Sequence, residues 1–353
     1  MKNFLTFKPL SLFSFFVFLA VFAFGQSSYG IPVKEKKSLF DLFQSEKKTE
    51  LTLTADFDSI KANIRNKEYV AGVLEIKQDN KNSTSLPVKL RPRGKSRRMM
   101  CDFPPLKLKF RKEYLDSVGI EKHDEFKLVT HCMETDWTQA VIMREYLTYQ
   151  LYNVITPYSF QAKLVNITYK NSGSSFKKAK NIGIVIEDPE AMAKRNKCKT
   201  MGQMVIKLDS LHEEQEKIAT VFQFMIGNAD WSFAMARNTE LIQMKDGHIV
   251  PVPYDFDYAG LVKAPYARAN AALGQRSVLD RVYLGSASSY EELEPCFNYF
   301  KSKKAELLQT LAGFKGLDFV SENEMRIYIN DFFELINDKS RVENEMLRRV
   351  KKG

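Results

Sequence analysis

The stretch Gly227–Gly260, GNADWSFAMARNTELIQMKDGHIVPVPYDFDYAG, decides how the rest of this sequence is interpreted. The segment before it, His212–Ile226, has apolar residues three and four positions apart, which predicts a helix that ends at the first glycine of the stretch. Asp246–Gly247 is a pair typical of hairpin turns. We therefore expect two antiparallel strands here, Thr239–Met244 and His248–Tyr254.

Four oxygen-bearing side chains lie beside these predicted elements. Asp230 follows the helix end, and Asn238 opens the first strand. Asp255 and Asp257 follow the second strand and, being two residues apart, point to the same side of an extended backbone. Carboxylate and amide oxygens are the ligands that Mg²⁺ or Mn²⁺ takes together with phosphate oxygens. The pattern predicts a divalent-metal site, with turn-forming and capping acids as the alternative.

The composition is that of a globular chain. Its 353 residues are 44% hydrophobic and 27% charged, which excludes the disordered, collagen-like and disulfide-dense classes. The 53 Lys and Arg exceed the 43 Asp and Glu, so the formal net charge is +10. A basic balance favours acidic partners such as nucleic acid, phosphates or anionic membranes, and charge alone does not choose among them.

Residues 1–25 have the pattern of a secretory signal peptide. Lys2 and Lys8 provide a basic start, and Leu10–Phe24 is an apolar run too short for a comfortable membrane span. We therefore expect cleavage and a periplasmic, cell-surface or secreted protein, with an uncleaved anchor as the alternative. Export argues against a nucleic-acid partner. No later stretch approaches the roughly 18 apolar residues of a membrane helix.

The cysteines Cys101, Cys132, Cys198 and Cys296 have no zinc-binding spacing. An oxidising compartment favours disulfide pairing. We expect a Cys101–Cys132 disulfide, because each cysteine lies beside a strand-like segment, PPLKLKF and EFKLVTH, and these segments could be neighbours in a sheet. Separate buried thiols are the alternative.

The pattern of apolar residues changes along the chain. Residues 26–50 are polar and Lys-rich, so we expect a flexible arm. Residues 51–188 are mostly strand-like, with one predicted helix at about 137–154, and residues 189–353 are mostly helical. The order of elements predicts an α+β fold of two lobes, a strand-rich N-terminal lobe and a helix-rich C-terminal lobe.

Two basic segments lie upstream of the hairpin. The turn Leu90–Arg98, LRPRGKSRR, contains Arg93 and Gly94. Further on, Lys107 and Lys109 alternate with apolar residues, so both lie on one face of a strand. Such a basic surface could contact the phosphates of a nucleotide, an anionic glycan or lipid headgroups.

With these segments in place, the sequence resembles the spore-coat protein H (CotH) family of atypical, kinase-like proteins. The turn Leu90–Arg98 looks like the family's Arg-x-Arg-Gly-Asn-Ser turn, with Lys95 in place of Asn. Phe103–Phe110 is similar to the basic strand that follows, and Gly183–Asp188 to the strand before the family's inter-lobe connection. The sequence also resembles a group of exported proteins with the signature RGxxRR…CxFPPL…KLVTHC.

The hairpin region carries the catalytic part of the resemblance. In protein kinases a catalytic-loop Asp and Asn precede a hairpin that ends in a metal-binding Asp-Phe pair. Asp230, Asn238 and Asp255 follow the same order. The sequence departs from the pattern because no His-Arg pair precedes Asp230, the gap to Asn238 is longer, and Asp257 replaces a glycine.

The resemblance implies a two-lobed protein-kinase-like fold, with ATP as substrate and Mg²⁺ or Mn²⁺ as cofactor. Asp230 would be the catalytic base. Asn238 and Asp255 would hold the metal that bridges the nucleotide phosphates, with Asp257 as a second ligand or its neighbour. The residues implied to contact the nucleotide are Arg93, Gly94, Lys107, Lys109, Lys127 and Glu187, and the sequence does not choose among the lysines. Solvated lysines, and a Glu187 that caps the following helix, are the alternatives.

Two functions from different classes follow. The first is an exported CotH-like kinase that transfers the γ-phosphoryl group of a nucleotide to a protein Ser or Thr, or to a sugar hydroxyl. The second is a catalytically inactive protein that serves as a binding or assembly module at the cell surface or in the periplasm, which Lys95 in the altered turn favours. A metal-dependent hydrolase is a third possibility, but the chain has only 4 His for such a site.

Overall fold

The computed structural model describes residues 1, 36–43, 49–77, 83–94, 96–202 and 204–348. The described residues from Lys36 to Arg348 belong to one compact unit. The predicted signal peptide, apart from Met1, and part of the predicted arm lie outside the described residues.

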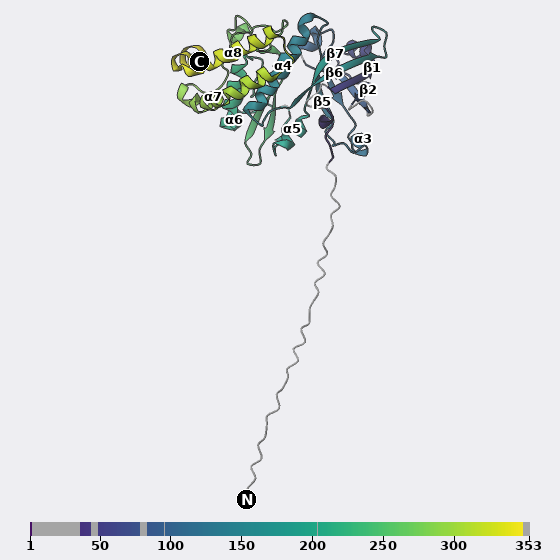
Figure 1. Cartoon of the computed structure of the whole chain (residues 1–353), viewed down its shortest axis with the longest axis horizontal. Helices are drawn as coiled ribbons and strands as arrows, with labels where there is room; N and C mark the ends of the chain where they lie inside the picture. Colours follow the sequence, from purple (N-terminus) through teal and green to yellow (C-terminus); the bar gives the residue numbers. More distant parts are fainter. Residues whose placement is uncertain (2–35, 44–48, 78–82, 95, 203, 349–353) are drawn as a thin grey trace. The chain divides into compact units, whose positions relative to one another are not determined.

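Seven strands close into a barrel (Figure 1). Their order around the barrel is β1-β2-β3-β4-β5-β7-β6, and β6 pairs with β1 in parallel while the other neighbours are antiparallel. Closure pairs each strand on both sides, which leaves this sheet without an open edge. The strands are β1 (Thr49–Ala55), β2 (Val70–Lys77), β3 (Ser83–Pro92), β4 (Leu106–Lys109), β5 (Glu125–Val129), β6 (Ala162–Asn171) and β7 (Lys178–Ile186).

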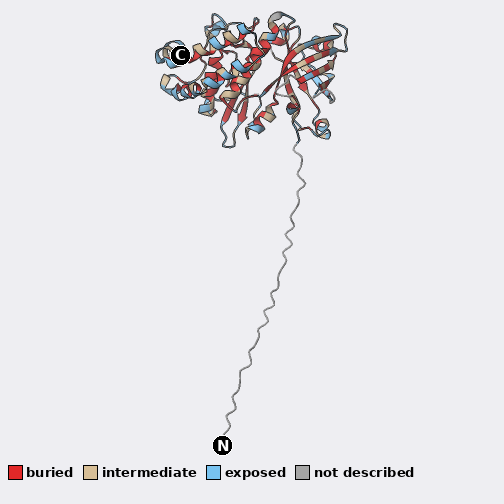
Figure 2. Ribbon diagram, in the orientation of Figure 1, coloured by how far each residue is buried: buried red, intermediate tan, exposed pale blue. Residues whose placement is uncertain are grey.

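Alternating side chains fill the interior of the barrel. In β1, Leu51 and Leu53 are buried, while Thr52 between them is only half-buried and Glu50 is exposed. In β4, the leucines point inward, so Lys107 and Lys109 share the outer face, as their spacing predicts. Figure 2 shows buried residues along the strands and on the inner sides of the helices.

Helix α4 (Asp136–Ile155) covers the outer face of β6 and β7. Ile184 and Ile186 of β7 belong to the same buried cluster as Leu147 and Leu151 of the helix. On its other side α4 contacts α7 and the turn Phe256–Tyr258. The helix therefore joins the barrel to the rest of the unit through a continuous apolar core.

The remaining elements follow or connect the barrel strands. The other helices are α1 (Phe57–Ala62), α2 (Ser96–Met100), α3 (Lys112–Ser117), α5 (Pro189–Arg195), α6 (Glu213–Met225), α7 (Tyr290–Gly313), α8 (Phe319–Asn337) and α9 (Lys339–Arg341). A three-stranded sheet of order β10-β9-β8 consists of β8 (Lys199–Thr200), β9 (Thr239–Gln243) and β10 (Ile249–Pro253). Short turns of 3-10 or π helix are η1 (Phe40–Leu42), η2 (Leu208–Ser210), η3 (Phe256–Tyr258), η4 (Ala271–Leu273) and η5 (Val342–Met346).

The predicted fold class, an α+β protein with a two-lobed protein-kinase-like arrangement, was wrong. The strands close into a seven-stranded barrel, because β1 pairs with both β2 and β6 and β7 lies between β5 and β6. The parallel β1–β6 pairing joins residues more than a hundred positions apart, such as Leu51 and Ile167. Strand patterns show which residues are extended but not which distant strands pair.

The local predictions around the hairpin were confirmed. β9 and β10 pair antiparallel across the Asp246–Gly247 turn. Helix α6 ends at Met225, and Gly227 has a φ of 67°, in the left-handed region that favours glycine. A side chain at this position would also collide with Tyr328.

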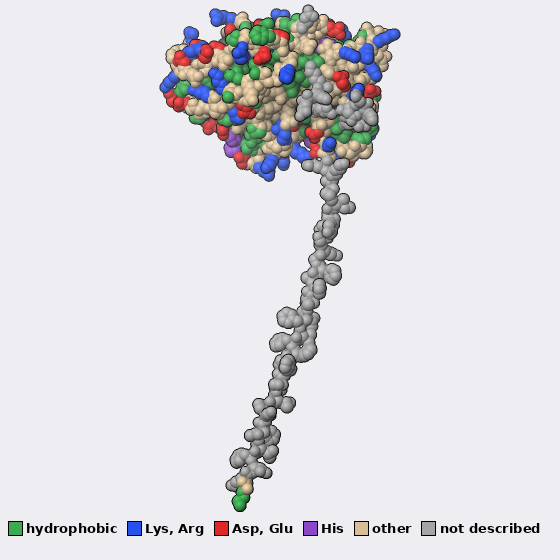
Figure 3. All heavy atoms as spheres, viewed as in Figure 1, with side chains coloured by type: hydrophobic (Ala, Val, Ile, Leu, Met, Phe, Trp, Pro, Cys, Tyr) green, Lys and Arg blue, Asp and Glu red, His purple; other side chains and the backbone are tan. Residues whose placement is uncertain are grey.

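The described part of the predicted N-terminal arm is packed rather than loose. Leu39, Phe40 and Phe43 are buried in the cluster that fills the barrel. These apolar side chains anchor a segment whose many lysines predicted a flexible arm. The surface is mixed, and on the face seen in Figure 3 basic and acidic side chains are interspersed. Within the described ranges, no helix has the length and apolar character needed to cross a membrane.

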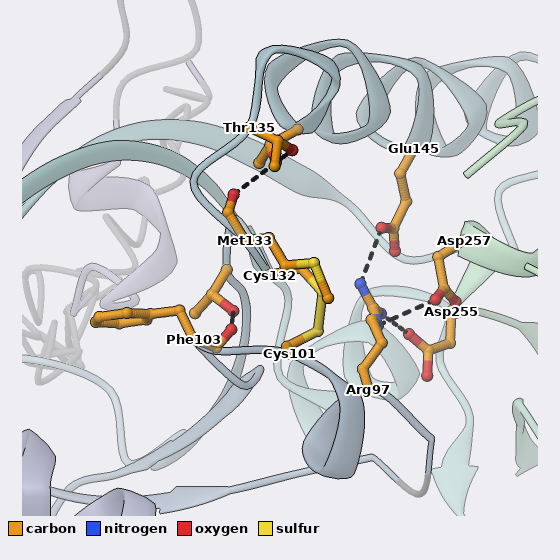
Figure 4. Close-up of a disulfide and its surroundings, with 11 residues drawn as sticks. Arg97, Cys101, Phe103, Cys132, Met133, Thr135, Glu145, Asp255 and Asp257 are labelled. Atoms are coloured by element: carbon orange, nitrogen blue, oxygen red, sulfur yellow. Dashed lines mark hydrogen bonds and ion pairs between the residues drawn. A yellow bond between two sulfur atoms is a disulfide. The ribbon is translucent and has the colours of Figure 1, made fainter. Parts of the chain in front are cut away.

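The Cys101–Cys132 disulfide is confirmed. Cys101 directly follows α2, and Cys132 lies just beyond β5, with a Cα–Cα distance of 4.5 Å (Figure 4). The backbone N–H of Phe103 donates to the carbonyl of Cys132 at 2.9 Å, so the two segments are also hydrogen-bonded. Cys198 and Cys296 are free thiols.

Replacing both Cys101 and Cys132 by Ser is expected to lower the free energy of unfolding. The disulfide closes a loop with a sequence separation of 31, for which the chain-entropy relation gives roughly 3–4 kcal/mol. Urea unfolding of the mature protein without reductant measures the difference. Cys198→Ser is the matched control and is expected to change stability little, and equal loss in both variants would contradict the assignment.

Candidate functional site

One cavity of about 1000 Å³ gathers most of the predicted site residues. It lies where the outer face of β3, β4 and β5 meets the loop after α6 and the ends of β9 and β10. The predicted residues that line it are Arg93, Gly94, Lys107, Lys127, Asp230, Asn238, Asp255 and Asp257.

Asp255 and Asp257 are placed by a sharp turn at the end of β10. Asp255 has a φ of 65°, which is uncommon for a residue with a side chain, and its N–H donates to the hydroxyl of Tyr149 on α4 at 2.9 Å. Between the two acids, Phe256 is fully buried and packs on Tyr149, with the two ring centroids 4.8 Å apart. Helix α4 therefore anchors the turn that presents both carboxylates.

A third carboxylate, from Glu145 in the middle of α4, completes a buried cluster (Figure 4). One oxygen from each of Glu145, Asp255 and Asp257 lies within 4.8 Å of the others. Arg97 of α2 forms ion pairs with all three, with Nη1 3.3 Å from Glu145, Nε 3.1 Å from Asp257 and Nη2 2.5 Å from Asp255. Its side chain is only 5% exposed.

The pKa values of the three carboxyls are shifted in different directions. Burial opposes ionisation of Asp255, but the charges of Arg93 and Arg97 outweigh it and hold the pKa of this carboxyl below its usual value. Burial raises the pKa of Asp257 well above its usual value and also raises the pKa of Glu145, despite the nearby Arg97. The raised pKa values mean that Arg93 and Arg97 do not fully stabilise all three acids in their ionised form, and a further cation would favour that form.

Asp230 lies on a separate, more open part of the cavity. Its side chain is 44% exposed, and its N–H donates to the side chain of Asn228 at 3.0 Å. Asn238, with a φ of 50°, donates from Nδ2 to the backbone oxygen of Asp230 at 2.6 Å and to its carboxylate at 3.1 Å. The carbonyl of Asn238 accepts from the N–H of Tyr254, so the Asp230 loop is tied to the segment that carries Asp255.

Basic residues of neighbouring strands also line the cavity. Lys107 stands across from Arg91 on β3 and from Lys127 on β5. Lys107 is paired with Glu125, whereas Lys127 Nζ is buried with no hydrogen-bond partner among the described residues. It lies 3.8 Å from the centre of the Tyr254 ring. Burial and then the charge of Arg93 lower the pKa of Lys127 to about 8.

Lys109 and Glu187 do not line this cavity. Lys109 Nζ lies 3.2 Å from Glu125, and its side chain is 44% exposed. Glu187 is buried, and its Oε2 lies 2.8 Å from Nη2 of Arg195. The same oxygen accepts a hydrogen bond from the backbone N–H of Gln161. It is neither the partner of a cavity lysine nor the helix cap, since the neighbouring Asp188 caps α5.

Sequence reasoning missed Arg97, Glu145 and Glu240 as residues of this region. Glu145 had a usable signal, because its neighbours one turn away, Val141 and Tyr149, are buried, so an acid stands in the apolar stripe of a predicted helix. Arg97 had no such signal among several basic residues in one turn.

A comparison of the sequence with protein-family models gives no match, and a comparison with curated proteins gives none. The resemblance to the CotH family therefore stays a prediction. The geometry of the described residues carries the functional proposal.

Lys127→Met is expected to stabilise the protein near neutral pH. Lys127 has a pKa of about 8 in the folded chain against an ordinary 10.5, so below pH 8 folding buries its charge. Between about pH 8 and 10.5 the unfolded chain binds more protons, and wild-type stability rises relative to the variant. The difference in free energy of unfolding between Lys127→Met and the wild type should reach about 3 kcal/mol below pH 8 and close as the pH rises.

Urea unfolding at several pH values measures this gap. The groups that act on Lys127 are Arg93, Glu240, Asp255 and Lys107, and all remain in the variant. Lys109→Met is the control. The hydrogen bond of Lys109 with Glu125 raises the pKa of Lys109, which is the opposite direction to the shift of Lys127. A gap for Lys127→Met that stays constant across the range would show that Lys127 is not buried as a charge.

Proposed function

We propose that this protein is a metal-dependent phosphotransferase that moves the γ-phosphoryl group of a nucleotide to a hydroxyl acceptor. The observation that supports the proposal is a single cavity lined by clustered carboxylates and by a buried ammonium with no hydrogen-bond partner among the described residues. Phosphoryl transfer needs both, since catalysis depends on positioning and on neutralising the phosphate charge.

The residues fit a hard divalent cation. The carboxylates of Asp255 and Asp257 approach each other closely and provide oxygen ligands. Asn238 lines the same cavity, and its amide oxygen is a further candidate. Bound Mg²⁺ or Mn²⁺ would neutralise charge on the phosphate oxygens.

Basic groups on the facing strands suit the phosphates of ATP. Lys127 and Arg93 each have a buried nitrogen without a hydrogen-bond partner among the described residues. Gly94 has a φ of 79°, and no described atom lies within 4 Å of where its side chain would begin. The turn therefore allows close approach of a phosphate to the backbone. Lys107 is a further phosphate contact once it leaves Glu125.

Asp230 is the proposed general base. Its exposed carboxylate takes the proton of the acceptor hydroxyl as the new O–P bond forms. The bond between the γ-phosphorus and the β–γ bridging oxygen breaks, and the nucleoside diphosphate leaves with those electrons. A protein Ser or Thr, or a sugar, would supply the hydroxyl, and the exported location predicted for the chain places that acceptor outside the cytoplasm.

The second candidate is a catalytically inactive binding or assembly module. The observation that favours it is Arg97, whose guanidinium already forms ion pairs with the carboxylates that a metal would need. A protein with this arrangement could hold an anion at Lys127 and Arg93 without transferring phosphate.

Radiolabel transfer from [γ-³²P]ATP with Mg²⁺ or Mn²⁺ separates the two functions. Asp230→Asn is expected to lower the transfer rate about 10²–10⁴-fold, the usual contribution of a general base, while leaving nucleotide binding in place. Asp255→Asn is expected to abolish the metal-dependent thermal shift by ATP. Because Asp255 is a buried ion-pair partner, the melting temperature of each variant is measured first.

Asp246→Asn is the matched control, because Asp246 lies in the exposed turn of the same hairpin, with its side chain 57% exposed. It should retain wild-type transfer. Absence of both transfer and a nucleotide-induced shift in the wild type would reject the phosphotransferase. A shift without transfer would favour the binding module.

A further inference from the structure

Glu145 is the most deeply buried member of the carboxylate cluster. Its side chain is fully buried, and its Oε1 has no hydrogen-bond partner among the described residues. Its other oxygen contacts Arg97 at 3.3 Å, which is longer than a good charged hydrogen bond. Leaving a buried carboxylate oxygen without a partner is costly, so this atom marks a place for another positive group.

Arg97 balances the cluster only in part. Its guanidinium is shared among Glu145, Asp255 and Asp257, and the additional Arg93 reaches Asp255 at 3.5 Å. A divalent cation carries twice the charge of Arg97 and could accept one oxygen from each acid, since these atoms lie within 4.8 Å of one another. The same oxygens cannot serve both cations fully.

The cavity gives the side chain of Arg97 room to move. It lines the cavity of about 1000 Å³, next to the proposed phosphate contacts. Its helix α2 is held at the C-terminal end by the disulfide at Cys101 (Figure 4). The guanidinium would therefore move by rotation of its long side chain rather than by displacement of the helix.

We propose that Glu145, Asp255 and Asp257 form a three-carboxylate divalent-cation site and that Arg97 is its internal counter-ion, which the cation displaces. The inference rests on the proposed function for its biological use and adds Glu145 and Arg97 to that site. Cation affinity is then reduced in the wild type, because only the fraction of molecules with Arg97 moved aside is competent to bind.

Mn²⁺ binding without nucleotide tests the exchange, with free Mn²⁺ measured by electron paramagnetic resonance. Arg97→Ala is expected to bind Mn²⁺ about tenfold more tightly than the wild type, because its competitor is gone. Glu145→Gln, which keeps the size of the side chain, is expected to weaken binding about tenfold. Arg97→Gln is a second neutral variant in case Arg97→Ala does not fold, and circular dichroism checks both.

Arg326→Ala is the matched control, since Arg326 is exposed on α8 and contacts Asn323. It should bind Mn²⁺ like the wild type. Unchanged or weaker binding in the folded neutral variants of Arg97 would overturn its role as counter-ion, and unchanged binding in Glu145→Gln would overturn the third ligand. If the exchange holds but no variant or wild type transfers phosphate, the phosphotransferase fails while this inference stands.

Discussion

The ion cluster around Arg97 connects the parts of this structure that matter for its chemistry. Arg97 comes from a short helix beside the barrel, Glu145 from the middle of α4, and Asp255 and Asp257 from the turn after β10. These segments are far apart in the sequence. Each ion pair is buried, where removing one partner leaves an uncompensated charge and destabilises strongly. The positions of the barrel strands, α4 and the hairpin relative to one another therefore depend on the ion pairs of this cluster.

Neutral contacts hold the elements around this cluster. The disulfide attaches the end of α2 to the chain just beyond β5, which limits where Arg97 can lie. Tyr149 accepts a hydrogen bond from the backbone of Asp255, and its ring packs on Phe256. Both constraints act on backbone near the acids rather than on the carboxylates, so the acids and the arginine can change partners while the frame stays in place. This combination of a fixed frame and exchangeable charges is what a binding site requires.

The sequence predicted local elements better than their assembly. The Asp246–Gly247 turn, the stop at Gly227 and the alternation of Lys107 with leucines are local patterns, and the structure has all three. The barrel depends on the distant pairing of β1 with β6, which no local pattern encodes, so the fold class was wrong. Most of the predicted site residues meet in one cavity because the acids cluster around one hairpin, whereas Glu145 reaches this region only through the packing of α4. Lys109 and Glu187 lie outside the cavity, because sequence position does not determine which partner a side chain meets.

The charges in the cavity are hard to explain by stability alone. Among the described residues, a buried carboxylate oxygen of Glu145 and the buried ammonium of Lys127 have no hydrogen-bond partner. Both cost free energy of folding, and apolar side chains of similar volume would avoid that cost. Arg97 offsets the acids, so the cluster by itself could belong to an inactive module. Lys127 is a different case, because burial and then the charge of Arg93 lower its pKa to about 8 against the attraction of Glu240 and Asp255. The proposed inactive module would hold an anion at Lys127 and Arg93, and the proposed phosphotransferase would hold the phosphates of a nucleotide there together with a cation. Both proposals therefore use anion binding at Lys127, and transfer of the phosphoryl group is the step that distinguishes them.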